Sequence, residues 1–551
     1  MIDLRLARIL TRWALGVAVA SGLATAAAAA IQEPVHTESG LVAGMPSWGH
    51  GVRVFKGVPF AAPPVGPLRW RPPQPAAPWK GVRAATSFSP ACMQQMRPRG
   101  VAPWNTGENG YSEDCLYLNV WTPAKSAADR LPVMVWIYGG GGREGSGAEA
   151  LYAPDNLAKR GVVVVSFNYR VNLFGWMASP ELTAESPDHA SGDYGALDQV
   201  AALKWVRANI AAFGGDPEKV TIFGESGGSR SVNWLMASPM ARGLFRGAIA
   251  QSHTVFDRMQ TLKEAEADGR AFQARVGVAP LAKLRALPAA ELLAIYLDTP
   301  DPQKRMNAAI VDGRFLPADI RTIFEQGRQN DVALITGGTA DEPGGRTHPG
   351  GLPTTAAGYA AWLKSAYGPA AERLLAAYPA TSDAQAQASY HALLRDANFS
   401  GHRTWARLQT LTGKQPAFLY LFSRAPPAYG PDGRPTRRAG APHGSDVAYA
   451  FDNLRYADLP WDAGDRLMAD LTPQYWVNFA RTGDPNGPGL PAWPKYDPKN
   501  EQMLNLDLPP RAQPVMDPAA LDALDQALSG RGRAARGALT SPAPGIRGAA
   551  P

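Results

Sequence analysis

The sequence predicts an α/β fold in which helices flank a large, mostly parallel central sheet. Near-continuous apolar runs at 132–138, 161–170, 220–223, 332–338 and 416–422 are typical of strands buried on both faces. Helical patterns separate these runs, and the order strand, helix, strand implies right-handed parallel crossovers. Ligands bind such sheets at the carboxyl ends of the strands.

The first elements are predicted to be strands around a loop. Residues 40–44 and 52–55 resemble early antiparallel strands, and 113–121 alternates as a strand does. Prolines fill the stretch from Phe55 to Trp70, which predicts an extended loop held by its aromatic side chains. An amphipathic helix at 198–212 leads toward the strand that begins at Val220.

The second half of the chain alternates helical insertions with core strands. Helical patterns are predicted at 261–276, 288–297, 355–412 and 465–480. The pair Trp493-Pro494 begins a last edge segment. No repeat of fixed period is present.

Gly224-Glu225-Ser226-Gly227-Gly228 stands at the end of the central strand. In a nucleophile elbow, a serine occupies a strained turn between strand and helix, and its hydroxyl is presented above the sheet edge. Glycines two residues to either side avoid collision with the neighbouring strand and helix. A Gly-x-Ser-x-Gly pentapeptide alone is usually an ordinary turn, but the strand before it and the helix that follows favour the catalytic interpretation.

Both ends of the chain are predicted to lie outside the folded domain. Residues 1–30 combine a basic segment, an apolar run and Ala-x-Ala cleavage sites, which predicts a signal peptide rather than a membrane anchor. Residues 529–551 are rich in Gly, Ala, Arg and Pro and are expected to be disordered. The range 31–528 is then one catalytic domain of a secreted or periplasmic protein with no stable membrane insertion after cleavage.

The formal net charge of +7 comes mostly from these ends. Residues 1–30 contribute +2 and residues 529–551 contribute +4, which leaves +1 for the body of the chain. A nearly neutral body argues against nucleic-acid binding, which needs a basic surface.

The chain has two cysteines, Cys92 and Cys115, and eight histidines. An even number in an exported chain suggests one disulfide bond, and two free buried thiols are the alternative. Neither the cysteines nor the histidines show the spacing of a metal site, so no metal or cofactor is expected.

A serine nucleophile needs a histidine base and an acid that orients the base. In this type of fold they follow the serine in the order acid, then histidine. His443, in a Pro/Gly loop after the strand 416–422, is the favoured base, and His253 is an alternative. Asp341 and Glu342 both follow a core strand, and the residues alone do not choose between them.

Five further candidates have plainer interpretations. His348 is too close to the acid candidates in the chain, and His391 and His402 fall in or near helices. Arg143 and Arg346 flank the two loops of the site, where they would favour acidic esters if they faced the pocket and would otherwise be solvated.

The glycine run after the strand 132–138 has two interpretations. Gly140-Gly141-Gly142-Arg143-Glu144-Gly145 matches Gly-x-Gly-x-x-Gly of dinucleotide-binding folds. The following Gly-Ser-Gly discourages the required helix, and the next strand ends without an acid. The favoured alternative is an oxyanion loop, in which Gly140, Gly141 and Gly227 donate backbone N–H groups.

Together these segments resemble the type-B carboxylesterase/lipase family, the cholinesterase-like α/β-hydrolases that include bacterial para-nitrobenzyl esterases. The resemblance covers roughly residues 35–500. It rests on several blocks with the specific residues of the family: Phe55–Trp70, Glu113–Val120, Tyr138–Gly141, Asn168-Tyr169-Arg170, Phe213–Ser226, Asp341-Glu342, His443-Gly444, and Trp476 through Thr482-Gly483-Asp484-Pro485.

The resemblance implies an α/β-hydrolase fold and a serine carboxylesterase that acts on small-molecule esters. It implies a role for each of the following residues: Ser226 as nucleophile, Glu342 rather than Asp341 as acid, His443 as base, Gly140, Gly141 and Gly227 as oxyanion donors, Glu225 as a buried support, and a Cys92–Cys115 disulfide. A non-catalytic binding module on the same fold is the rival, but such proteins lose residues of the triad. Hydrolysis of amides or thioesters stays open.

Four positions depart from the family pattern. Gly142 replaces an aromatic residue, Gly227 an alanine, Pro343 a glycine and His253 a glycine. These departures are expected to change substrate preference more than chemistry, and Gly142 predicts a roomier acyl side.

Overall fold

An 11-stranded mixed sheet forms the centre of the fold in the computed structural model, which describes residues 31–48, 51–95, 109–278, 280–300, 306–342 and 353–529. The strand order is β18-β17-β14-β13-β12-β11-β9-β10-β8-β4-β3. The bounds are β3 Met45–Pro46, β4 Arg53–Pro59, β8 Tyr117–Thr122, β9 Leu131–Ile137, β10 Val163–Phe167, β11 Gly215–Glu225, β12 Gly247–Gln251, β13 Ala333–Thr339, β14 Ala417–Phe422, β17 Gln502–Leu506 and β18 Arg511–Pro514.

The middle of this sheet is parallel, as the buried apolar runs predict. Every neighbouring pair from β10 to β17 is parallel, and the antiparallel strands are confined to the two edges. The chain passes from β9 to β10 on one side and then returns to β11 on the other side of β9. This reversal is a topological switch point, where α/β proteins place their ligands.

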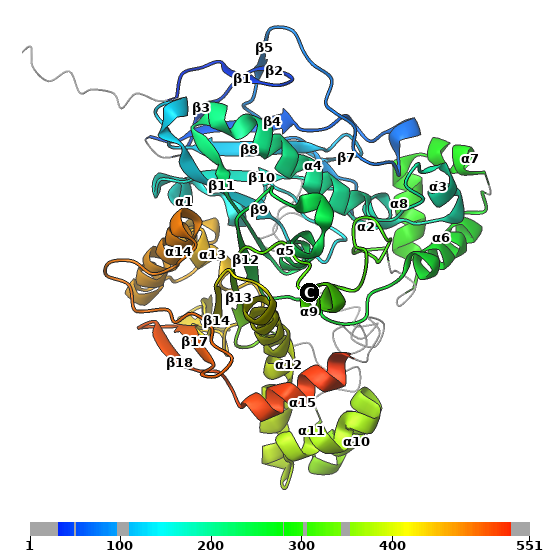
Figure 1. The fold of residues 1–551 in the computed structure, drawn as a ribbon. Helices are drawn as coiled ribbons and strands as arrows, with labels where there is room; N and C mark the ends of the chain where they lie inside the picture. Colours follow the sequence, from blue (N-terminus) through cyan, green and yellow to red (C-terminus); the bar gives the residue numbers. More distant parts are fainter. Residues whose placement is uncertain are drawn as a thin grey trace, which may run out of the picture.

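Helices cover both faces of the sheet (Figure 1). Helices α4, α5 and α12 lie on one side, and α13 and α14 lie on the other. The helix bounds are α1 Asp155–Lys159, α2 Asn172–Trp176, α3 Pro180–Glu185, α4 Tyr194–Asn209, α5 Gly227–Ala237, α6 Leu262–Val276, α7 Leu281–Ala286, α8 Ala289–Asp298, α9 Ile320–Glu325, α10 Ala356–Tyr367, α11 Ala371–Ala377, α12 Asp383–Thr412, α13 Val447–Ala450, α14 Ala463–Thr482 and α15 Pro518–Ser529.

Small sheets and a second apolar cluster surround this centre. The small sheets contain β1 Val35–Thr37, β2 Gly40–Ala43 and β5 Val82–Ala84, then β6 Ala91–Cys92 with β7 Tyr111–Ser112, and β15 Pro427–Tyr429 with β16 Pro435–Arg437. Helices α10, α11 and α15 pack with the first half of α12 around a cluster separate from the main core. Leu363, Leu374, Leu393 and Leu524 are buried there.

Two expectations about local structure are wrong. The stretch from Phe55 is not a loop throughout, because β4 continues to Pro59 and a bulge near Gly57 (φ +66°) adjusts its pairing with β8. Pro59 is tolerated because it ends the strand. No strand begins at Trp493, and the edge strands are β17 and β18 instead.

The predicted ends fall largely outside the described residues. The signal-peptide range 1–30 lies outside them, and so does the predicted tail except for its first residue, Ser529, which ends α15. Among the helices that the structure describes, none combines the length and apolar character that a membrane crossing requires.

Candidate active site

Ser226 is the single residue between β11 and α5. Its φ of 56° and ψ of −116° lie in a region that non-glycine residues rarely adopt. The strain is held from both sides, because the Ser226 amide donates to the carbonyl of Gln251 (2.9 Å) and its carbonyl accepts from the amide of Arg230 (3.1 Å). The serine is partly exposed, whereas Glu225 and Gly227 beside it are buried.

The glycines around Ser226 are required by close backbone approach. A Cβ at Gly228 would lie 1.9 Å from the carbonyl oxygen of Ile137, and a Cβ at Gly224 would lie 2.7 Å from the same atom. A Cβ at Gly227 would lie 2.9 Å from the amide nitrogen of Gly141. The start of α5 is therefore packed directly against the end of β9 and the glycine loop that follows it.

The glycine loop lies beside the serine. Gly140, Gly141 and Gly142 have φ values of 85°, 64° and 70°, which favour glycine at each position. A Cβ at Gly139 would lie 3.1 Å from the Ser226 Cβ, whereas a Cβ at Gly141 meets nothing within 4 Å. The space in front of Gly141 is therefore open.

Gly142 does not create extra room. A Cβ there would lie 2.0 Å from the carbonyl oxygen of Asn307. The Gly142 carbonyl is also fixed, because it accepts from the Asn172 amide (2.7 Å) and from Nε1 of Trp176 (3.0 Å). The expected roomier acyl side is thus wrong at this position, since the backbone at 307 occupies the space that an aromatic side chain would fill.

Glu342 and His443 are in contact, although 101 positions separate them in the sequence. Nδ1 of His443 lies 2.5 Å from Oε2 of Glu342, and the other oxygen of Glu342 accepts from the Thr339 amide (3.0 Å). On the far side of the ring, Nε2 of His443 lies 3.1 Å from Oε1 of Glu225, without the alignment of a hydrogen bond. The imidazole is therefore held between two buried carboxylates.

These two carboxylates have different proton affinities. Burial acts to raise the pKa of Glu342, but the positive charge of His443 and the hydrogen bond to it prevail and hold the pKa below its ordinary value. Burial raises the pKa of Glu225 to about 7; His443 opposes this, while Asp446 and Glu342 reinforce it. Glu342 is thus the carboxylate that stays ionised beside the ring.

Two aspartates hold the loop that carries His443. The residues alone left Asp341 as an alternative acid, whereas Asp446 was assigned no role from the sequence. The Asp341 amide donates to the carbonyl of Ala441 (3.0 Å), and Oδ2 of Asp341 accepts from the Ala441 amide (2.8 Å). Oδ2 of Asp446 accepts from Nε2 of Gln251 (3.0 Å) and from the hydroxyl of Tyr420 (2.8 Å). Asp341 thus ties the loop after β13 to the loop that carries His443, and Asp446 ties the latter loop to the sheet.

The other candidate residues are distributed as follows. His253 is partly exposed after β12, and its carbonyl accepts from the Ser229 hydroxyl (2.6 Å). His402 is buried in α12 with Nδ1 2.6 Å from the Thr336 hydroxyl, and His391 is exposed on the same helix. Arg143 is exposed. His348, Arg346 and Pro343 lie outside the described residues.

Cys92 and Cys115 are joined by a disulfide bond. It connects the short strand β6 to the segment that enters β8. Within the described ranges, His, Cys, Asp and Glu side chains do not gather in the groups of three that a metal ion would need.

A buried carboxylate behind the glycine loop gives a testable pH dependence. Oε1 of Glu149 accepts from the Ser146 amide (3.1 Å), and the buried Oε2 has no well-aligned hydrogen bond among the described residues. Burial raises the Glu149 pKa to about 8, against the opposing effects of the Ser146 amide and the Tyr152 side chain. Since the folded state binds this proton more tightly than the unfolded state, the free energy of unfolding falls as pH rises from about 4.5 to 8. Glu149→Gln is expected to remove the contribution of this residue to the fall in the free energy of unfolding. That contribution is a few kcal/mol, since each pKa unit corresponds to about 1.4 kcal/mol.

Urea unfolding of the wild type and Glu149→Gln at pH 5.5 and 8.5 measures the effect. Glu225 contributes a similar slope to both proteins, so the difference between them isolates Glu149. Equal pH slopes in the two proteins would contradict the assignment.

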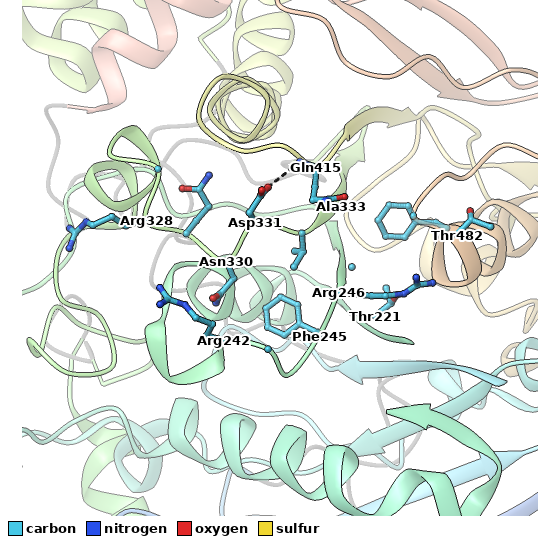
Figure 2. A pocket seen from close by; sticks show the side chains of 17 residues that line it. Thr221, Arg242, Phe245, Arg246, Arg328, Asn330, Asp331, Ala333, Gln415 and Thr482 are labelled. Atoms are coloured by element: carbon cyan, nitrogen blue, oxygen red, sulfur yellow. Dashed lines mark hydrogen bonds between the residues drawn. The ribbon is translucent and has the colours of Figure 1, made fainter. Parts of the chain in front are cut away.

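A cavity in the described part of the chain lies away from Ser226. It has a volume of about 590 Å³ (Figure 2). Its lining includes Gly247 and Ala333, the first residues of β12 and β13, and Thr221, which pairs with Gly247 in β11. Ser226, in contrast, follows the carboxyl end of β11. Arg246 there donates to the Ala480 carbonyl (2.8 Å) near the end of α14. Its lining includes neither Ser226 nor His443 nor Glu342, so the cavity is not the predicted site.

A comparison with known proteins identifies the family of this chain. The model of the carboxylesterase family matches residues 32–523. The chain belongs to the carboxylesterase family. This carboxylesterase is 37% identical to a fumonisin B1 esterase of Sphingopyxis macrogoltabida over 85% of each chain, and 35% identical to a pyrethroid hydrolase of Mus musculus, Ces2a, over 84% of each chain.

Solved structures agree with these relatives. A PNB esterase superposes on the carboxylesterase with a TM-score of 0.74 at 31% identity, and the match covers 89% of this chain and 99% of that chain. The predicted α/β-hydrolase fold and the predicted family are confirmed. The enzyme is a carboxylesterase, and hydrolysis of carboxylic esters is its activity.

Proposed function

We propose that the enzyme hydrolyses small-molecule carboxylic esters through an acyl-enzyme on Ser226. His443 acts as base and Glu342 as the acid that orients it. The amides of Gly140, Gly141 and Gly227 form the oxyanion hole. The observation that carries the proposal is the His443–Glu342 contact of 2.5 Å between loops that follow the neighbouring parallel strands β13 and β14.

The reaction has two halves. His443 accepts the Ser226 proton through Nε2 while Oγ attacks the ester carbonyl, and the three amides stabilise the negative oxygen of the tetrahedral intermediate. The imidazolium returns the proton to the departing alkoxide, and the alcohol leaves. Water, deprotonated by the same ring, then attacks the acyl-enzyme and releases the carboxylic acid and free Ser226.

The two carboxylates have distinct parts in this scheme. Glu342 accepts from Nδ1, which leaves Nε2 unprotonated so that it can act as the base. Glu225, 3.1 Å from Nε2, stabilises the imidazolium electrostatically when it is ionised. We also propose that the protein is exported, supported by the signal-like segment 1–30 and by the Cys92–Cys115 disulfide.

Labelling with a fluorophosphonate tests the mechanism. The wild type is expected to gain one adduct by intact mass and to lose its activity on 4-nitrophenyl butyrate, whereas Ser226→Ala should gain none. Ser87→Ala, a change at an exposed serine, should label as the wild type does. Stoichiometric labelling of Ser226→Ala, or hydrolysis by it at the wild-type rate, would overturn the proposal.

A further inference from the structure

Arg230 is a buried cation that forms no ion pair with a carboxylate of the described residues. Four arginines of the described residues are more than nine-tenths buried, and three of them pair with carboxylates: Arg69 with Glu113, Arg170 with Asp198 and Arg403 with Glu501. Arg230 is 8% exposed, and its Nη2 is buried with no hydrogen-bond partner among the described residues. Its environment therefore differs from that of the other three.

The guanidinium lies close to the proposed site. Arg230 is one helical turn after Ser226 in α5, and its amide donates to the Ser226 carbonyl (3.1 Å). Helical side chains point back toward the N-terminus, which directs this one toward Gly227 and the glycine loop.

Two charged or titrating side chains act electrostatically on the Arg230 guanidinium. They are Tyr169 and Arg143. The Tyr169 hydroxyl donates to the Tyr138 carbonyl (2.9 Å), one residue before the loop begins at Gly139, and Arg143 directly follows the loop. Arg143, which follows the glycine loop, and Tyr169, which is bonded to the residue before the loop, thus both interact with the Arg230 guanidinium.

The arrangement is unfavourable unless an anion joins it. Burial lowers the pKa of Arg230 to about 10, and the charge of Arg143 adds to this effect while Tyr169 opposes it. The carboxylates nearest the serine, Glu225 and Glu342, are engaged with His443. Burial of an ion without a partner is unfavourable, and a guanidinium is the side chain best suited to bind a carboxylate through two hydrogen bonds.

We propose that Arg230 binds a free carboxylate carried by the ester, so that the enzyme prefers esters with an anionic acyl or alcohol group to neutral esters of the same length. This rests on the proposed function of Ser226. One helical turn rises about 5.4 Å, so the carboxylate would be on the order of two to four carbon atoms from the scissile group. Arg230 is then a specificity-determining residue of the same site.

Paired substrates test the proposal on both sides of the ester bond. The acyl pair is ethyl pentanoate and monoethyl glutarate, and the alcohol pair is butyl butyrate and 4-(butyryloxy)butanoate. Arg230→Met removes the charge and keeps an apolar stem of similar length, and Arg230→Lys restores the charge. Arg242→Gln, at an exposed position beside the cavity at the opposite edge of the sheet, is the charge-matched control.

The wild type is expected to favour the anionic member of at least one pair. Arg230→Met should lower kcat/KM for that ester about 10- to 100-fold, mainly through KM, and leave the neutral esters and the control unchanged. Arg230→Lys should recover part of the loss. Arg230→Met should also raise Tm, because it removes a buried unpaired charge; a purely structural arginine would lower Tm instead.

Three results separate the two proposals. Equal loss on neutral and anionic esters in Arg230→Met would show that Arg230 acts on the reaction in general and would overturn the substrate preference. A wild type that hydrolyses the neutral esters at least as well as the anionic ones would do the same. A wild type that hydrolyses none of the four esters and does not label at Ser226 would count against the proposed function itself.

Discussion

His443→Ala is expected to lower kcat for ester hydrolysis by about 10⁴- to 10⁶-fold. The variant loses the proposed acceptor of the Ser226 proton. Glu225 is not expected to replace it, because with a pKa of about 7 this carboxylate is partly protonated at neutral pH. Its Oε1 also lies 3.1 Å from the Nε2 position that the variant lacks, and so does not itself occupy that position. The rate is measured with 4-nitrophenyl butyrate under saturating substrate.

The matched control for this variant is His391→Ala, a change at an exposed position of α12. It should retain the wild-type rate. A residual rate of His443→Ala within tenfold of the wild type would remove His443 from the proposed mechanism. Circular dichroism of both variants establishes that the fold is kept.

Gly228→Ala is expected to disrupt both stability and catalysis. The added Cβ would lie 1.9 Å from the Ile137 carbonyl oxygen and 2.9 Å from that of Tyr138, and neither backbone atom can rotate away as a side chain could. Relief requires α5 to shift away from β9, which moves Ser226. We expect a loss of about 3 kcal/mol in the free energy of unfolding and of at least about 10² in kcat, because a misplacement of 1 Å costs about that much.

Gly243→Ala provides the comparison, because its added Cβ meets nothing within 4 Å, although its φ of +75° makes any side chain mildly strained. Urea unfolding and steady-state kinetics on both variants separate the clash from that strain. Equal effects at the two positions would show that the contact between α5 and β9 is not what requires glycine at 228.

Much of the fold could be predicted because its signals are local. The buried strands β9, β10, β13 and β14 are apolar runs, and the turn at Ser226 is specified by glycines within two residues. The family resemblance then added the choice of Glu342 over Asp341. For these strands and for this turn, the residues of the segment itself are sufficient to predict its local structure.

What could not be predicted depends on contacts between distant segments. Asp341 and Asp446 look like ordinary loop carboxylates until the chain brings them to Ala441 and Gln251. The open space expected at Gly142 is filled by Asn307, which follows a helical insertion. The sequence predicts that Arg230 is an ordinary polar residue of a helix, and only the tertiary structure shows that its side chain is buried.

The short edge strands were missed for a related reason. β17 and β18 contain five and four residues, and their sequences lack a strong apolar run. Their pairing with β14 and with each other supplies the stabilisation that local propensity does not.

The position of α15 has a consequence for how the chain matures. Leu524 completes the peripheral cluster with Leu363, Leu374 and Leu393, yet it is contributed by the last described helix. Every residue proposed for chemistry has been synthesised before this helix emerges. In a growing or truncated chain that ends before Pro518, the apolar side chains of this cluster are therefore exposed to solvent, although all residues proposed for catalysis are present. An exposed apolar surface of this kind favours self-association.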